Sequence, residues 1–307
     1  MANVFVNPFT DFGFKKIFGE EASKPHLIDF LNALLPSKAQ IADLNFKNLE
    51  QLPAAEDRRK AVYDIYCQGT NGEYFIVELQ KARQNYFKDR TIYYSTFPIQ
   101  DQAKQGEWDY QLQAVYCIGV LNFRFAETPK LEKHKVIHTI KLKNQQNQVF
   151  YDKLSFIYLE MPNFNKSLEE LSTRLDKWLY FIKNLGDLQS IPELFKDKVF
   201  TTAFETAKLA NLDSSSREQY QQSLKILRDN YSVMKTAIDD AVLEAREVAL
   251  AEGEAKGREV GITEGETKGK LEAKLEIAIN AKAAGLPIKQ IEAITGLSSE
   301  ELEQHGI

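Results

Sequence analysis

Two acidic residues interrupt apolar runs in the first half of the chain. Asp64 lies within residues 60–68 (KAVYDIYCQ) and Glu78 within residues 73–79 (EYFIVEL). Both runs are rich in the β-branched and aromatic residues that strands favour, and residues 70–72, Thr-Asn-Gly, form a turn signal between them. The pattern therefore predicts a β-hairpin. Because side chains alternate between the two faces of a strand, the length of the turn decides whether the two carboxylates meet.

The turn has two plausible lengths. A two-residue loop sends Asp64 and Glu78 to opposite faces of the hairpin. A three-residue loop, with Gly72 at a positive φ angle, places Asp64 opposite Glu78 and puts Gln80 two residues further along. We predict the three-residue register, which brings both carboxylates to one place.

Two ionised carboxylates side by side in an apolar strand repel each other and lose hydration. A divalent cation compensates for both effects. Mg²⁺ prefers one or two carboxylates, with water and phosphate oxygens completing its coordination, and it lowers the pKa of a bound water that can attack phosphorus. Mn²⁺ is a second candidate. The alternative is that Asp64 or Glu78 merely faces solvent at a strand edge, because an Asp and a Glu on a hairpin are not specific by themselves.

The elements that must position this pair follow from periodicity, with strands in the first half of the chain and helices in the second. The predicted elements are a helix over 24–36 with Ser23 as its N-cap, the hairpin, a helix over 86–104, a buried strand over 112–123, one or two strands over 148–161, and a helical scaffold over 168–210.

The C-terminal part has an unusual regularity. A small residue, Ala or Gly, stands at every fourth position but one from Ala237 to Gly285, and the five from Gly253 to Gly269 are all glycines. Each Gly destabilises a helix by about 1 kcal/mol relative to Ala, unless close contact with another helix offsets the loss. We expect residues 237–285 to form a self-association helix that makes a homo-oligomer such as a dimer. A flexible connector is the alternative.

Residues 286–307 predict two short helices separated by Gly296, in the outline of a helix-turn-helix. The second of them, SSEELEQH, is acidic and offers no Arg, Lys or Asn to base edges. Contact with protein therefore suits this element better than contact with DNA.

Composition narrows the class of protein. A chain of 307 residues that is 43% hydrophobic can fill a core, so wholesale disorder is excluded. Cys67 and Cys117 do not make a disulfide framework, no apolar run is long enough to span a bilayer, and the first residues lack the features of a signal peptide. We therefore expect a cytoplasmic protein without membrane contact. Its net charge of -5 lies mainly in the tail, where 14 acidic residues face 8 basic ones from Asp240 onward.

Five segments together resemble one family. They are residues 7–19 (NPFTDFGFKKIFG), 63–65 (YDI), 77–80 (VELQ), 90–94 (RTIYY) and 106–123 (GEWDYQLQAVYCIGVLNF). Their order and spacing resemble the PD-(D/E)xK nuclease family transposases, also called recombination-promoting nucleases, over roughly residues 5–240.

This resemblance implies an α/β fold: a restriction-endonuclease-like mixed sheet flanked by helices, followed by an α-helical C-terminal tail. The nuclease-like domain would span residues 1–236 and have a helical second half. The implied activity is that of a Mg²⁺-dependent DNA endonuclease, a hydrolase of phosphodiesters that serves DNA recombination or the movement of a mobile element. Asp64 and Glu78 would be the catalytic metal ligands.

Gln80 takes the place of the usual lysine of the motif. An amide cannot supply positive charge and can only orient water or phosphate by hydrogen bonds, so low or conditional activity is expected. Arg90 and Tyr94 share a helix face, where the guanidinium could clamp a phosphate or simply stack on the phenol. Asp11 is either a further acidic residue of the site or a helix N-cap.

Two functions from different classes remain open. The first is the metal-dependent endonuclease. The second is a catalytically weak or inactive nuclease fold that acts as a DNA- or protein-binding regulatory module. The intact set of Asp64, Glu78 and Gln80 favours the first. The nearly neutral charge of the body favours the second a little, because a strong DNA binder usually carries more positive charge.

Overall fold

The computed structural model describes residues 3–51, 60–103, 109–126 and 132–307. Residue 104, at the end of the predicted helix over 86–104, and residues 106–108 of the family-like segment lie outside the described residues. The chain divides into two compact units, Met1–Arg228 and Asp229–Ile307, and each is described by itself.

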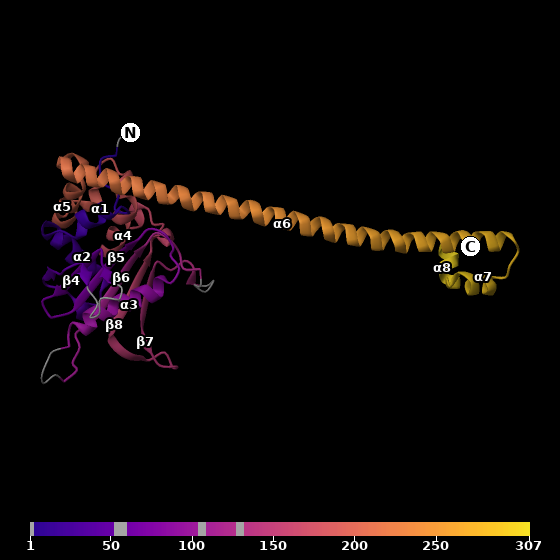
Figure 1. The fold of residues 1–307 in the computed structure, drawn as a ribbon, viewed down its shortest axis with the longest axis horizontal. Helices are drawn as coiled ribbons and strands as arrows, with labels where there is room; N and C mark the ends of the chain where they lie inside the picture. The colour runs from indigo at the N-terminus through magenta and orange to yellow at the C-terminus, as the bar shows by residue number, and fades with distance from the viewer. Residues whose placement is uncertain (1–2, 52–59, 104–108, 127–131) are drawn as a thin grey trace. The chain divides into compact units, whose positions relative to one another are not determined.

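The first unit is built on a mixed six-stranded sheet (Figure 1). Its strand order is β1-β4-β5-β6-β8-β7, in which β5, β6 and β8 run parallel and the other pairs are antiparallel. The strands are β1 (Leu44–Phe46), β4 (Ile65–Gly69), β5 (Tyr74–Gln80), β6 (Val115–Leu121), β7 (Ile137–Lys143) and β8 (Val149–Glu160). A separate two-stranded sheet pairs β2 (Glu50–Gln51) with β3 (Ala61–Val62). The predicted mixed sheet is confirmed.

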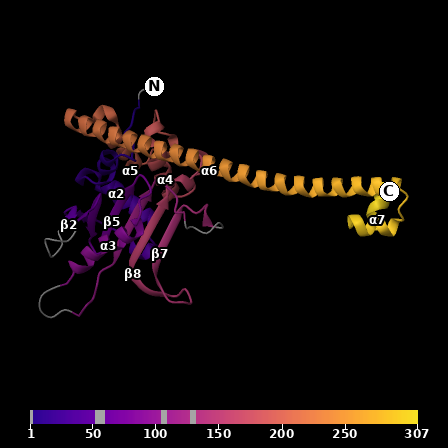
Figure 2. The same ribbon diagram turned by 45° about the vertical axis from the view of Figure 1, so that its right-hand side comes forward.

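Helices lie on both faces of this sheet. One face packs against α1 (Asp11–Phe18), α2 (Lys24–Leu34), α4 (Arg174–Asn184) and α5 (Lys198–Ala207), whose buried residues share one apolar cluster with the sheet. Helix α3 (Phe87–Gln100) packs with residues of the opposite face in a second cluster. Figures 1 and 2 show α2, α4 and α5 gathered together and α3 apart from them. Helix α3 connects β5 to β6, because parallel neighbours need a crossover rather than a tight turn.

Trp178 of α4 is the centre of the larger cluster. Its side chain is fully buried and its ring centroid lies 4.4 Å from that of Phe200 in α5. The indole N–H donates to Asp29 of α2 at 2.7 Å, so the one polar atom of the indole is satisfied. Arg174 bridges Asp29 and Asp197, which ties α2, α4 and the start of α5 together.

The structure corrects two local predictions. Ser23 occupies the N-cap position of α2 as predicted, but its hydroxyl donates to the carbonyl of Lys16 and makes no capping hydrogen bond. Strand β7 was not predicted at all. It lies at the sheet edge and most of its side chains are exposed or half-buried, so it lacks the buried alternation that marks a strand in sequence.

Helix α6 (Ser214–Ala283) contributes its first residues to the first unit and the remainder to the second. In the second unit it is followed by α7 (Ile288–Thr295) and α8 (Ser299–Gln304), which are separated by Gly296 at a φ angle of 65°. The two short helices predicted here are confirmed. They pack on the end of α6 through a small apolar cluster: Ala278, Ile291, Leu297, Leu302 and Ile307.

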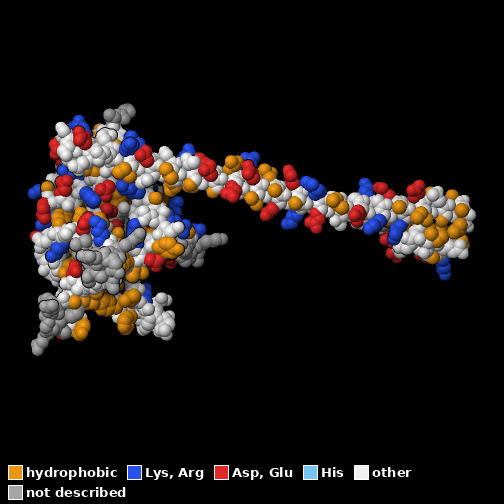
Figure 3. All heavy atoms as spheres, viewed as in Figure 1, with side chains coloured by type: hydrophobic (Ala, Val, Ile, Leu, Met, Phe, Trp, Pro, Cys, Tyr) orange, Lys and Arg blue, Asp and Glu red, His pale blue; other side chains and the backbone are white. Residues whose placement is uncertain are grey.

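The five helical glycines of α6 have nothing within 4 Å of the position where a Cβ atom would stand. Figure 3 shows hydrophobic, acidic and basic side chains interspersed along this helix. Across the described ranges, no helix combines the length and the apolar character that crossing a bilayer requires.

Candidate active site

The hairpin of β4 and β5 adopts the three-residue register. Ile65 pairs with Val77, so the residue before it in the chain, Asp64, falls opposite Glu78. The turn closes with a hydrogen bond from Gly69 N–H to the Glu73 carbonyl at 2.8 Å, and Gly72 has a φ angle of 94°, a conformation that favours glycine. The predicted register is confirmed, and with it the meeting of the two carboxylates.

Asp64 occupies a break between two strands. Val62 pairs in the small sheet and Ile65 in the large one, which leaves the peptide N–H of Asp64 outside either ladder. That N–H donates to Oε1 of Glu78 at 3.2 Å, and the N–H of Leu79 donates to Oδ2 of Asp64 at 2.7 Å. Each carboxylate is therefore held by the backbone beside the other.

Tyr63 anchors this break. Its side chain is buried, its N–H donates to the carbonyl of Leu49, and its hydroxyl donates to the carbonyl of Tyr94 in α3 at 3.0 Å. The residue in front of Asp64 therefore fixes the backbone against α3.

Glu78 projects from the middle of the sheet, where its side chain is only 9% exposed. Its partner on β6 is Gly119, which in turn pairs with Tyr158 on β8. A Cβ atom on Gly119 would lie 2.9 Å from Cδ1 of Tyr158, so any larger residue would displace that ring. The Tyr158 hydroxyl lies 2.7 Å from the Thr91 hydroxyl, which joins this part of the sheet to α3.

Burial makes the ionised pair unfavourable. Loss of hydration and then the negative charge of Asp64 together raise the pKa of Glu78 to about 8, against the lowering effects of the Asp64 N–H and Arg90. Burial also raises the pKa of Asp64, although the hydrogen bond from Leu79 N–H opposes that change. We therefore expect a positively charged group to bind beside Asp64 and Glu78 and to stabilise their ionised forms.

Arg90 of α3 supplies a cation beside the pair. Its charge lowers the pKa of Glu78, and its guanidinium donates to the side-chain carbonyls of Gln80 and Gln84. Gln80 also donates its amide to the Ala82 carbonyl at 3.1 Å, so both ends of this side chain are held. Gln80 thus orients Arg90, a role that the sequence analysis did not assign to it. Lys15 and Lys81 add positive charge, and each lowers the pKa of Asp64.

Arg90 and Tyr94 share one face of α3, as predicted. The guanidinium carbon lies 5.8 Å from the Tyr94 ring centroid, so the stacking arrangement is present. Nevertheless, Nε of Arg90 is buried and has no hydrogen-bond partner among the described residues. Because solvent does not reach Nε, a phosphate would have to contact the other guanidinium nitrogens of Arg90.

Asp11 is the first residue of α1 and not its N-cap. Thr10 caps the helix by accepting from Gly13 N–H at 2.9 Å, so the N-cap alternative for Asp11 is wrong. Asp11 pairs with Lys15 at 3.3 Å, and its charge is close enough to raise the pKa of Asp64. Its participation in the site stays a prediction.

The donor set fits a divalent cation. Asp64 and Glu78 each use one carboxylate oxygen in the hydrogen bonds above, and the other oxygen accepts none from the described part of the chain. Two adjacent carboxylates with a free oxygen each match the preference of Mg²⁺ for few protein ligands and several waters. Within the described ranges, no group of three or more His, Cys, Asp or Glu residues could hold a metal ion, so the remaining ligands would be water and substrate.

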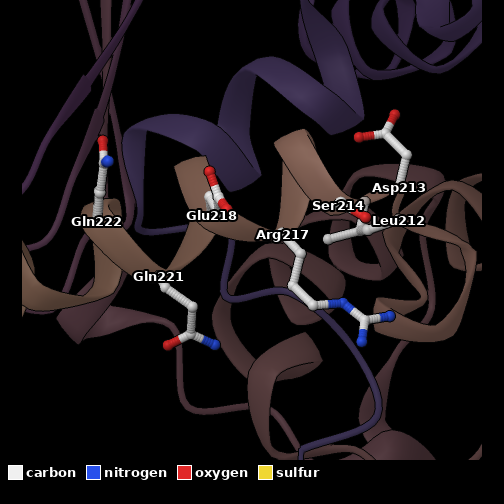
Figure 4. Close-up of a pocket in the computed structure, with 7 residues that line it drawn as sticks. All are labelled: Leu212, Asp213, Ser214, Arg217, Glu218, Gln221 and Gln222. Atoms are coloured by element: carbon white, nitrogen blue, oxygen red, sulfur yellow. The ribbon is translucent and has the colours of Figure 1, made fainter.

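A hollow of about 730 Å³ lies elsewhere, at the start of α6 (Figure 4). In Figure 4 the side chains of Glu218 and Gln222 point to one side of the helix, whereas those of Arg217 and Gln221 point to the other. Its lining includes none of the residues beside Asp64 and Glu78.

Several residues of the site were not singled out by sequence reasoning. Gly119 carried a signal, since a glycine inside a strand often marks close approach of a neighbour. Tyr158, Thr91 and Lys15 carried none, because each reaches the site from an element that is distant in sequence and was read as core or surface.

Comparison with known proteins identifies a family whose model matches most of the chain. The family described as PD-(D/E)XK nuclease family transposase matches residues 8–237, which include Asp64, Glu78 and all six strands of the large sheet. No match is found among curated proteins or among solved structures.

The raised pKa of Glu78 predicts a pH-dependent stability in metal-free protein. The stabilising contribution of protonated Glu78 is complete below its unfolded-state pKa near 4.5 and is lost as the pH rises to about 8. Glu78→Gln does not ionise, so in EDTA at about pH 9 it should unfold at least ~2–4 °C above the wild type, and the gap should narrow toward about pH 5.

Thermal unfolding followed by circular dichroism at several pH values measures this difference. Glu193→Gln, a change at an exposed residue, is the matched control and should follow the wild type. Parallel pH profiles for the wild type and Glu78→Gln would show that the Glu78 carboxylate is not held in an unfavourable charged state.

Proposed function

The chain belongs to the PD-(D/E)XK nuclease family transposases, and we propose that it is a metal-dependent endodeoxyribonuclease that hydrolyses DNA phosphodiesters. The observation that carries this proposal is the reciprocal pair, in which Asp64 and Glu78 are held side by side by each other's backbone. Family membership indicates a nuclease, and the pair supplies the place where its divalent cation would bind.

Asp64 and Glu78 would hold Mg²⁺, or Mn²⁺ in its place, through their free oxygens. When bound, such an ion activates water and offsets the charge that develops on the phosphate. The protein's own contribution is positional. The N–H groups of Asp64 and Leu79 fix the two carboxylates, and Arg90 places positive charge beside Glu78, where it would attract the phosphate. Glu78 releases its proton when it becomes a ligand, because its pKa lies near 8 in the metal-free protein.

The replacement of the motif lysine by Gln80 supports a low or conditional activity. Gln80 places positive charge at the site indirectly, by orienting Arg90. A guanidinium stabilises negative charge but does not give up its proton, so it cannot act as a general base. Deprotonation of the attacking water would therefore depend on the bound cation alone.

The biological setting is a further part of the proposal. Free, buried Cys67 and Cys117 suit a reducing cytoplasm, where the chain would act on chromosomal or mobile-element DNA during recombination. The competing function, a regulatory module that binds DNA or protein without cutting, would leave the carboxylate pair without a catalytic role.

Cleavage of supercoiled plasmid with Mg²⁺ and then Mn²⁺ tests the proposal. The wild type should nick the plasmid, EDTA should stop the reaction, and Asp64→Ala should lower the rate by at least ~100-fold, because a metal ligand is lost while the backbone N–H that holds Glu78 remains. Asp187→Ala, a change at an exposed acidic residue of the same unit, should cut like the wild type.

Two results would contradict the nuclease proposal. Equal cleavage by the wild type and Asp64→Ala would place the activity elsewhere or in a contaminant. No cleavage by either protein, together with retained DNA binding, would favour the regulatory module.

We also propose that residues 237–285 of α6 join two copies of the chain into a homo-oligomer, in the simplest case a dimer. Five glycines with open space around them weaken a lone helix, whereas they allow the backbone of a second helix to approach closely. The same helix exposes many large apolar side chains, among them Ile238, Val242, Leu243, Val248, Leu250, Val260 and Ile262. Helical wrapping with a partner would cover both features.

Gly261→Leu separates this proposal from a connector role. Leu favours a helix by about 1 kcal/mol relative to Gly, so the substitution should strengthen a lone helix yet block close approach. Light scattering on the full chain should show an oligomer for the wild type, a lower mass for Gly261→Leu, and no change for Thr263→Leu on the opposite face of the helix. A monomeric wild type would exclude self-association.

A further inference from the structure

A groove of about 640 Å³ lies between α3 and the edge of the sheet. Phe156 and Tyr158 of β8 line it together with His138 and Ile140 of β7, and α3 contributes Lys88 and Ile92 one helical turn apart. Its size falls within the range of about 300–1,000 Å³ that is typical of small-molecule sites.

The groove exposes apolar and aromatic surface. Ile92 is 54% exposed and Ile140 is 43% exposed, although both line a concave part of the first unit. Phe125 stands at the groove with its ring centroid 5.3 Å from that of Tyr158. Nζ of Lys88 lies 4.9 Å from the same Phe125 ring. Flat apolar ligands stack favourably on such a surface.

The charge of the groove is positive. Among the described residues that line it are three lysines, Lys88, Lys135 and Lys141, and one acidic residue, Glu132, which pairs with Lys135 at 2.7 Å. The groove thus fits a ligand that combines a flat ring with negative charge. Nucleotides have this combination, and proteins that bind single strands use the same arrangement of basic residues and aromatic stacking surfaces.

The groove adjoins the carboxylate pair. Tyr158 lines the groove and also a small void next to Glu78, which Thr91 and Gly119 share. Helix α3 carries Arg90 beside the pair and, two residues to either side, Lys88 and Ile92 at the groove. Residues two apart on a helix point to opposite sides, so a strand whose phosphate contacts Arg90 reaches the groove by passing around the first turn of α3.

We propose that this groove binds an unpaired nucleotide of the DNA strand next to the phosphate that is cut, with the base against Phe125 and Ile140 and its phosphates beside Lys88 and Lys141. The inference rests on the proposed function for its choice of DNA as the ligand. A base inside a duplex is stacked on its neighbours, so the groove selects single-stranded DNA or an extruded nucleotide. It thereby gives the enzyme a preference for unpaired or distorted DNA.

The test is binding of a short fluorescent single strand that carries 5-iododeoxyuridine, measured by anisotropy in EDTA so that no cleavage takes place. Ile140→Glu places a negative charge in the groove and should weaken binding about tenfold, the equivalent of one lost stacking contact. Ile92→Glu repeats this test from α3. Val149→Glu is the matched control, because Val149 lies on the same hairpin, is 48% exposed and does not line the groove.

Ultraviolet crosslinking of the same oligonucleotide locates the base. The wild type should give crosslinked peptides that contain Phe125, His138 or Tyr158, and unlabelled duplex of the same sequence should compete poorly. The inference is overturned if the wild type does not bind the single strand, if both groove variants bind like Val149→Glu, or if the crosslinks map only to other surfaces.

The two proposals fail in distinguishable ways. In one outcome, plasmid cleavage depends on Asp64, but Ile140→Glu and Ile92→Glu bind the single strand like the wild type. That outcome would reject the proposal for the groove and leave the nuclease proposal standing. In the opposite outcome, crosslinks in the groove disappear in Ile140→Glu, but Asp64→Ala cleaves plasmid as fast as the wild type. That outcome would support the proposal for the groove and reject the nuclease proposal.

Discussion

The burial of Asp64 beside Glu78 is the constraint on which the rest of the site depends. Among the residues that the structure describes, none forms a direct ion pair with either carboxylate, and burial raises the pKa of both. The structure accepts this unfavourable arrangement only because each side chain accepts a hydrogen bond from the backbone beside the other. The arrangement requires a strand break at Asp64, the three-residue turn that ends at Gly72, and a glycine at position 119, where a side chain would crowd Tyr158. An unfavourable buried pair with free oxygens is what a cation-binding site requires before the ion arrives.

Helix α3 links this pair to the proposed path of the substrate. It crosses one face of the sheet after β5, so the residues that follow Gln80 return beside the carboxylates. Gln80 fixes Arg90 by a side-chain hydrogen bond, and Tyr63 fixes the neighbouring turn of the helix through the Tyr94 carbonyl. Gln80, the uncharged residue of the motif, therefore still determines where the guanidinium of Arg90 lies. The same helix forms one wall of the groove, which explains how catalysis and selection of unpaired DNA would be coupled through one element.

Sequence alone predicted the features that depend on local chemistry. The alternation of side chains and the Thr-Asn-Gly turn limited the register of Asp64 and Glu78 to two possibilities, because both signals lie within one hairpin, and the predicted one is present. The order of the family-like segments was sufficient for the mixed sheet, and the family match over residues 8–237 agrees with it. Sequence could not show that Gln80 binds Arg90, because that contact depends on how α3 folds back on β5. It also missed β7, an exposed edge strand, and assigned Ser23 a cap that its hydroxyl does not make.

The central claim is that the carboxylate pair is a divalent-cation site. Calorimetric titration of the metal-free protein with Mn²⁺ at about pH 7, repeated in buffers that differ in ionisation enthalpy, tests it most directly. Because the pKa of Glu78 is about 8, the Glu78 carboxyl is protonated in most molecules at about pH 7. Binding of Mn²⁺ should therefore release close to one proton per ion, and it should be lost in Asp64→Ala. Binding without proton release that persists in Asp64→Ala, or no binding at all, would contradict the account.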